Sequence, residues 1–148
     1  TKLNEEVLTP QGINVVKKKK GNFVLWGMRT INRTADFQFR PHRLQLSHYI
    51  RTFLEAFDWV IFSLNDPKLR RQLAGQFRVF FQQELTRGAI TGTDVADAAP
   101  VKIDDDNNTA ATAEAGDLHA DVAVRLTGVV ERFIISIGKQ GVFENTSA

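Results

Sequence analysis

A proline-marked junction in the middle of the chain separates two segments with helical periodicity. Residues 41–62 begin at Pro41, and proline is well tolerated in the first turn of a helix. At Asn65-Asp66-Pro67, the aspartate can cap a second helix and the proline suits its first position. That second segment runs to Gly88, a residue type that commonly follows a helix end. Because the link is short, we expect the two helices to be antiparallel neighbours.

Apolar residues recur at helical spacing in both segments, and they predict the faces that the helices bury. In the first segment these residues are Ile50, Phe53, Leu54, Phe57, Val60 and Ile61, and in the second they are Leu69, Leu73, Phe77, Phe80 and Leu85. We expect the pair to bury together Phe53, Phe57, Ile61, Phe77 and Phe80.

Strand patterns lie on both sides of the helical pair. Residues 13–17 and 22–29 lean toward β structure, and Gly21-Asn22 between them tolerates positive φ, which predicts a hairpin. Both faces of 22–29 are apolar, a pattern typical of a strand covered on both sides. Further strand candidates are residues 101–103, 119–126 and 132–138. This order predicts an α+β domain, a small mixed β-sheet with two antiparallel α-helices packed on one face.

Composition limits the kinds of protein that the chain can be. Its 148 residues suit one domain with a real core. It has no cysteine, so disulfides and thiolate metal sites are excluded. No apolar run approaches the length of a membrane span, and we expect neither a signal peptide nor a membrane partner. The first residue is Thr1, so we expect either a processed product or a piece of a longer chain, and favour the second.

The net charge of +2 hides an uneven distribution along the chain. Residues 93–121 hold eight acidic residues against one lysine, so the remainder is basic. Opposite poles on a small domain suit self-association in arrays, while a solvated acidic loop is the simpler alternative.

No constellation of side chains supports catalysis. The run Asp104-Asp105-Asp106-Asn107-Asn108 invites comparison with an EF-hand loop, but Thr109 and Ala115 stand where that loop needs glycine and glutamate. An acidic turn is the better interpretation. His42 and His48 are six residues apart, off the spacings that share a helix face. We therefore expect no enzyme activity, no metal site and no cofactor.

Two basic groups are candidates for contact with a partner. One is the turn Lys17–Lys20, near the aromatic Phe23 and Trp26. The other comprises Arg70, Arg71 and Arg78 in the second helical segment. Together they suggest an alternative function, a small basic-patch nucleic-acid-binding domain. The even overall charge balance disfavours it, and a charged hairpin tip that resists edge aggregation is the simpler interpretation.

Several short motifs follow one another in a distinctive order. They are Leu3-Asn4-Glu5-Glu6, Ile13-Asn14-Val15-Val16, the block Trp26-Gly27-Met28-Arg29-Thr30, Arg40-Pro41-His42-Arg43, the junction from Phe62 to Pro67, the exit from Gly88 to Gly92, and the apolar stretch Phe133–Ile137. In order and spacing they resemble the C-terminal domain of contractile-tail sheath proteins of bacteriophages and related injection particles. The resemblance covers nearly the whole chain.

The resemblance implies that residues 1–148 are the inner, tube-proximal domain of a longer sheath subunit. Such subunits form six-fold rings around an inner tail tube, between a baseplate and a tail terminator. They shift from an extended to a contracted state and drive the tube through a target envelope, with no nucleotide and no nucleic-acid contact. Their location would be the virion tail, assembled in the host bacterial cytoplasm.

The resemblance also assigns residues to contacts. Sheath subunits complete each other's sheets with exchanged terminal strands, and the candidate strand comprises Phe133, Ile134, Ile135, Ser136 and Ile137. A terminal strand of this kind adds to a sheet edge through main-chain hydrogen bonds. The candidates for the tube contact are Arg70, Arg71, Arg78, Lys18, Lys19 and Lys20.

Overall fold

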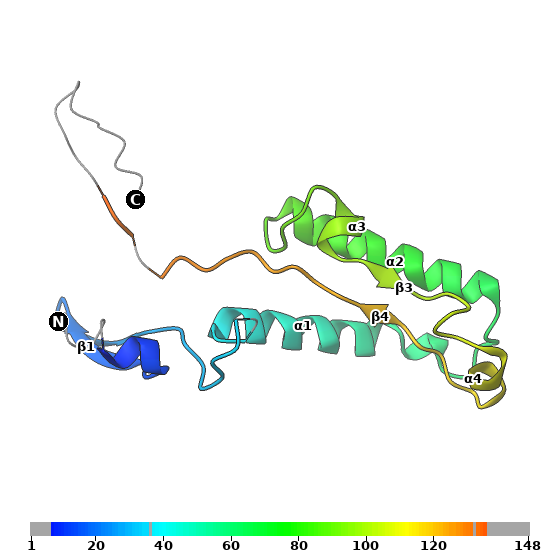
Figure 1. Cartoon of the computed structure of the whole chain (residues 1–148), viewed down its shortest axis with the longest axis horizontal. Coiled ribbons are helices and arrows are strands. Elements are labelled where there is room, and N and C mark those ends of the chain that lie inside the picture. The colour runs from blue at the N-terminus through cyan, green and yellow to red at the C-terminus, as the bar shows by residue number, and fades with distance from the viewer. Residues whose placement is uncertain (1–6, 36, 132, 136–148) are drawn as a thin grey trace, which may run out of the picture.

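The computed structural model describes residues 7–35, 37–131 and 133–135. These residues form an elongated molecule, with a β-hairpin at one end and a body of helices and short strands at the other (Figure 1). In chain order the elements are η2 (Thr9–Gln11), β1 (Val15–Lys19), β2 (Asn22–Trp26), α1 (Arg40–Ala56), η3 (Asp58–Val60), α2 (Pro67–Thr86), α3 (Val95–Ala98), β3 (Val101–Lys102), α4 (Ala110–Glu114) and β4 (Asp121–Val122).

The two long helices begin as the sequence predicts. Asp66 caps α2, because its side chain accepts a hydrogen bond from the backbone N–H of Leu69 at 2.7 Å. The first helix is shorter than predicted. It ends at Ala56 rather than near residue 62, and the 3-10 helix η3 continues the chain. The two helices run antiparallel, as predicted (Figure 1).

An aromatic cluster joins α1 to α2. The ring of Phe53 lies 4.6 Å from that of Phe77, and the ring of Phe57 lies 4.8 Å from it, between centroids. These residues and Phe80 share one core, as the sequence predicts. The prediction for Ile61 is wrong, because its side chain is 63% exposed beyond the end of α1. The most deeply buried ring belongs to Phe81, which the sequence pattern did not single out.

The buried face of α1 is rotated from the predicted one. Tyr49 is buried, whereas Ile50 and Leu54 are more than half exposed. The apolar surface of α1 is wider than the strip that α2 covers, and Tyr49 occupies the centre of that strip. Its ring lies edge-on to those of Phe80 and Phe81, at 5.4 and 5.7 Å. Half of the apolar face of α1 therefore remains on the surface.

The second sheet covers one side of the helical pair. Strands β3 and β4 are antiparallel, and Val101 pairs with Val122. Val122, Val124 and Leu126 pack against the core, which confirms the predicted alternation of residues 119–126 for these three residues. The helices thus pack on one face of this sheet. A close approach fixes the neighbouring turn, since a Cβ at Gly92 would lie 2.8 Å from the backbone of Ala98.

The strands form two separate sheets rather than the single mixed sheet that was predicted. The hairpin pairs β1 with β2 antiparallel, from Val15 opposite Trp26 to Lys19 opposite Asn22, and its turn is Lys20-Gly21. All five residues of β2 are exposed, so no layer of described secondary structure packs on either face of this strand. The α+β class is confirmed, and the sheet content is two antiparallel strand pairs.

The aromatic cluster should dominate the stability of the helical body. We expect Phe77→Ala and Phe81→Ala each to lower the free energy of unfolding by about 3–5 kcal/mol, because each leaves a cavity in a packed core. Leu54→Ala, on the exposed side of α1, is the matched control and should cost far less. Urea denaturation measures the free energy of unfolding of all three variants. Equal losses in the two phenylalanine variants and in Leu54→Ala would contradict this packing.

A buried polar network links the same two helices to the segment after α2. The hydroxyl of Tyr49 donates to Oε2 of Glu84 at 2.8 Å, and Nε2 of Gln45 donates to that hydroxyl oxygen at 2.7 Å. Gln45 also donates to the backbone carbonyl of Ala89, and Arg87 pairs with Glu84 at 2.9 Å. Burial, followed by the hydrogen bond to Glu84, raises the pKa of Tyr49 to about 12.

This shift predicts how stability depends on alkaline pH. The pKa of Tyr49 is higher in the folded than in the unfolded chain. The contribution of its neutral hydroxyl to the free energy of unfolding is therefore complete below about pH 10 and is lost as the pH rises toward about 12. The stability advantage of the wild-type chain over Tyr49→Phe should shrink across that window. The chain has one tyrosine, so its tyrosinate absorbance reports this group alone. A tyrosinate titration with its midpoint near pH 10 in the folded chain would contradict the hydrogen-bond network around Tyr49.

Candidate assembly surfaces

The β1–β2 hairpin presents apolar side chains without a covering layer. Val16 is 62% exposed and faces its cross-strand partner Leu25, which is 52% exposed. Phe23, near the turn, is 78% exposed. Each strand of a two-stranded sheet also keeps one edge of unpaired backbone groups. The hairpin is therefore a surface that can accept further strands, with apolar side chains on which they can pack.

The base of the hairpin is bound to the outgoing end of the chain. Arg29 donates from Nε and Nη2 to the two carboxylate oxygens of Glu131, at 2.7 and 2.5 Å. This bidentate geometry is the strongest form of such a pair, and the Glu131 hydrogen bond raises the pKa of Arg29. The backbone of Arg29 is also held by the side chain of Asn14 through two hydrogen bonds. Sequence reasoning placed Arg29 in a motif but gave it no partner.

The candidate exchange strand starts just beyond this ion pair. Phe133, Ile134 and Ile135 are 81%, 75% and 64% exposed, and none of them pairs in a strand within the described residues. Ser136 and Ile137 lie outside the described residues, as does most of the predicted strand at 132–138. The described part is an apolar segment open to solvent, and its role in strand exchange stays a prediction.

The three arginines of α2 do not form one exposed group. Arg70 is buried, and its guanidinium donates to Asp105 at 2.7 Å and to the side chain of Asn65 at 2.9 Å. It holds the loop before α4 against the start of α2. Arg71 and Arg78 remain exposed and form no ion pair within the described part of the chain. The candidate contact on α2 is thus reduced to Arg71 and Arg78.

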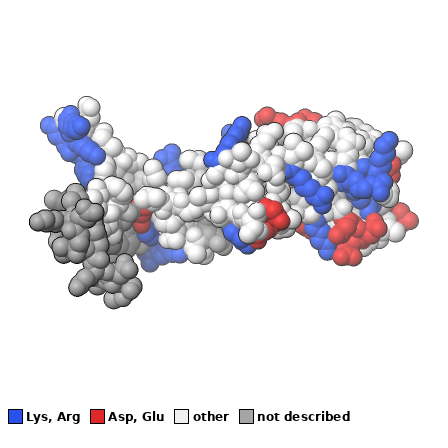
Figure 2. Space-filling view, turned by 90° about the horizontal axis from the view of Figure 1, so that it is seen from above, with Lys and Arg blue, Asp and Glu red and all other residues white. Residues whose placement is uncertain are grey.

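The two basic groups lie far apart. Figure 2 shows lysine and arginine atoms gathered at the end of the molecule where Figure 1 places the hairpin, which carries Lys18, Lys19 and Lys20. The Nζ atoms of Lys17 and Lys19 lie over the ring of Trp26, at 3.5 and 4.5 Å from its centroid. No continuous basic stripe joins this turn to α2 on the face drawn in Figure 2.

The acidic segment is partly neutralised within the chain. Asp97 pairs with Arg125, Asp106 with Lys102, and Asp105 with Arg70. Figure 2 accordingly shows acidic and basic atoms mixed around the end opposite the hairpin. Among the described residues there is no group of three or more side chains that could hold a metal ion. No described helix is long and apolar enough to span a membrane.

The link between α1 and α2 holds an aromatic side chain in solvent. Phe62 is fully exposed, and its φ of 68° lies in the left-handed region. For a residue other than glycine this conformation costs roughly 1–2 kcal/mol. The turn is nevertheless fixed, since Ile61 N–H donates to the carbonyl of Asp58 and Ser63 N–H donates to that of Val60. Strain that persists in a fixed turn is a common mark of a functional site.

Solved structures of contractile assemblies contain this fold. A chain of the anti-feeding prophage baseplate, determined with six-fold symmetry, matches with a TM-score of 0.83 and 20% identity over 94% of this chain and 39% of its own. A chain of the PVC sheath complex, from an extracellular contractile injection system in the contracted state, matches with a TM-score of 0.80 and 22% identity. This match covers 95% of this chain and 40% of that one. A chain of the contracted helical sheath of the anti-feeding prophage matches with a TM-score of 0.77 and 21% identity, over 95% of this chain and 40% of its own.

The chain shares its fold with these contractile-assembly chains. The resemblance predicted from the sequence is therefore confirmed at the level of fold. The match extends over nearly all of this chain, which spans about two fifths of the length of the chains it matches. The sequence matches no family model, and comparison with curated proteins also finds no match.

Proposed function

We propose that this chain is the C-terminal, tube-proximal domain of a contractile sheath subunit. The observation that carries the proposal is the shared fold over 95% of the chain with a chain of a helical sheath and one of a sheath complex. The role is structural rather than catalytic. Copies polymerise around an inner tail tube and rearrange from an extended to a contracted state, which drives the tube through a target envelope.

The arrangement of stiff and open parts supports this role. The aromatic cluster makes α1, α2 and the β3–β4 sheet one body, whereas the hairpin and residues 133–135 lie away from it (Figure 1). A lattice that changes shape without dissolving needs rigid bodies joined by links that persist. We assign the hairpin as the acceptor of strands from neighbouring copies, and Phe133–Ile137 as a donated strand. Main-chain hydrogen bonds would carry this link.

Further partners follow from the same proposal. The sheath would meet a baseplate at one end and a tail terminator at the other, on a bacteriophage tail or a related injection particle assembled in the bacterial cytoplasm. No nucleotide is required, because the free energy released on contraction is stored when the subunits assemble. For the inner tube there are two candidate contacts, the turn Lys18–Lys20 and the exposed pair Arg71 and Arg78.

Removal of residues 132–148 tests the donated strand. The truncated chain keeps Glu131 and hence its ion pair with Arg29, so circular dichroism should show an unchanged fold. Negative-stain microscopy should show tubes for the chain that keeps residues 132–148 and none for the truncated chain. Both are compared in the same sequence context, that of the full-length subunit. Tubes formed without these residues would assign the exchange to another segment.

The acceptor can be tested in the same assay. Leu25→Asp places a charge on the hairpin face and should abolish polymerisation, while Ile31→Asp, which alters a 95% exposed side chain outside the strands, is the matched control. A mixture of the truncated chain with Leu25→Asp should stop at dimers in sedimentation, because one has only an acceptor and the other only a donor.

Charge reversal distinguishes the two candidate tube contacts. Co-assembly with the tube protein should weaken only in the variant whose group meets the tube, either the one with Lys18, Lys19 and Lys20 changed to glutamate or the one with Arg71 and Arg78 changed. Exposed ion pairs are worth only about 0–1 kcal/mol each, but they repeat at every subunit and are screened by salt. Normal extended tails from both variants at moderate and high salt would reject a tube contact through either group.

A further inference from the structure

Two features of the helical body are unexplained by strand exchange. One is the turn between α1 and α2, where Ile61, Phe62 and Leu64 are 63%, 103% and 85% exposed. Hydrogen bonds fix this turn although Phe62 is strained, so the side chain is held in solvent rather than left there by disorder. We name these three residues the apolar knob. Exposed apolar side chains gathered in one place commonly mark a contact with another protein.

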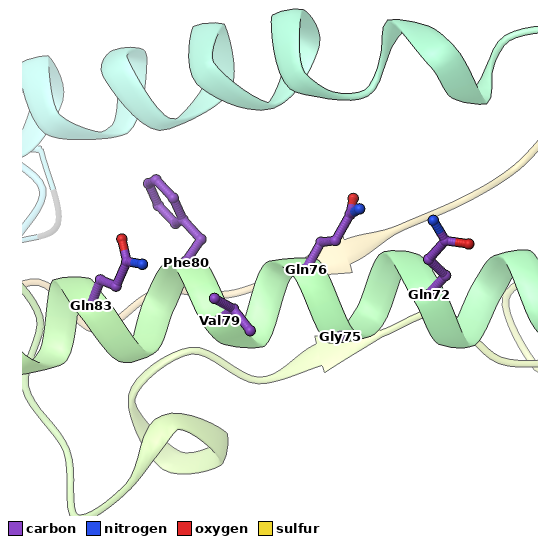
Figure 3. Close-up of a pocket in the computed structure, with 6 residues that line it drawn as sticks. All are labelled: Gln72, Gly75, Gln76, Val79, Phe80 and Gln83. Atoms are coloured by element: carbon purple, nitrogen blue, oxygen red, sulfur yellow. The ribbon is translucent and has the colours of Figure 1, made fainter.

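The other feature is a hollow on α2. It has a volume of about 480 Å³ and is lined by Gln72, Gly75, Gln76, Val79, Phe80 and Gln83. Figure 3 shows Gln72, Gln76 and Phe80 projecting from α2 on the side where α1 passes. Val79 is 62% exposed, and three glutamine amides surround the apolar part. We name this surface the α2 groove.

Gly75 has no evident packing role among the described residues. It lies in the interior of α2, where glycine is less favourable than alanine, and a Cβ there would meet no described atom within 4 Å. Packing inside this molecule therefore does not require a glycine at this position. A glycine in a helix does permit another molecule to approach the backbone closely.

The charges beside the two features are opposite. Residues 52–67, which include the knob, hold three acidic residues (Glu55, Asp58, Asp66) and no basic one. Residues 68–83, which include those that line the groove, hold four basic residues and no acidic one. Of the four basic residues, only Arg70 is buried. Two copies can thus bring the acidic side of one against the basic side of the other.

We propose that the apolar knob of one copy inserts into the α2 groove of a second copy, with Phe62 over Gly75. Arg71 and Arg78 then face Asp58 and Glu55 of the inserting copy. The two surfaces differ, so the contact is head-to-tail and generates a ring or a helix rather than a closed dimer. This inference deepens the proposed function by naming a second contact between copies. It leaves the Lys18–Lys20 turn to meet the tube.

Disulfide trapping tests the contact directly, because the native chain has no cysteine. Phe62 is fully exposed, and Gly75 is partly exposed with no described atom within 4 Å of an added Cβ. The two cysteines can join only if their Cα atoms approach within about 7 Å. Mixing the two single variants under mild oxidation should give a mixed dimer several-fold more abundant than Ile31→Cys mixed with Gly75→Cys. A chain carrying both cysteines should give a ladder of oligomers.

Two results of the trapping experiment would overturn the proposal. One is a yield no higher than that of the Ile31→Cys control. The other is a Phe62→Cys chain that joins only to itself, which would indicate a symmetric contact. If mixed dimers form but no sheath-like tubes appear, the contact between the knob and the groove is supported and the proposed sheath function is rejected. If tubes form but the mixed disulfide does not, this contact is rejected and the proposed sheath function still stands.

Phe62→Gly separates assembly from folding. Glycine adopts positive φ without strain, so this variant should keep or raise the Tm of the chain while its assembly falls several-fold. Assembly that is unchanged in Phe62→Gly would overturn the proposal. Charge exchange gives a second measure: Arg71→Glu with Arg78→Glu should weaken self-association, and adding Asp58→Arg with Glu55→Arg should restore it. Failure of that rescue also counts against the contact.

Discussion

The packing of Phe53 and Phe57 of α1 against Phe77 and Phe81 of α2 is the interaction on which the rest of the molecule depends. It fixes two long helices side by side and supplies the surface on which the β3–β4 sheet rests. The hairpin contributes nothing to this core, because every residue of β2 is exposed. Among the described residues, the chain therefore contains one helical body with a core of its own and one hairpin that lies outside that core.

Much of this arrangement could be predicted from the sequence. The junction at Asp66-Pro67 predicted the start of α2, and the alternation after His119 predicted which of its residues face the core. Periodicity could not decide which half of the apolar surface of α1 is buried, since that choice depends on where α2 lies. The sequence analysis did not place Tyr49 in the core, and only the structure shows Glu84 and Gln45 satisfying its hydroxyl there.

The candidate site was harder to predict, for physical reasons. A sequence cannot show that Arg70 is enclosed, because its partner Asp105 is distant in the chain and the pair forms only when α2 meets the loop before α4. The apolar pattern of β2 predicted a strand covered on both sides, but all five of its residues are exposed in the described chain. In this case the pattern describes the assembly that we propose rather than the isolated chain.

The ion pair between Arg29 and Glu131 has a mechanical consequence. It fastens the C-terminal segment to the base of the hairpin just before the exposed residues Phe133–Ile135. In a polymer linked through that segment, tension between neighbouring copies would reach the domain at Arg29, whose backbone Asn14 also holds. Backbone hydrogen bonds from Thr30 to Gln38 and from Arg40 to Met28 connect this point to the start of α1. The ion pair therefore gives the C-terminal segment a second attachment to the domain, besides the backbone that leads back to β4.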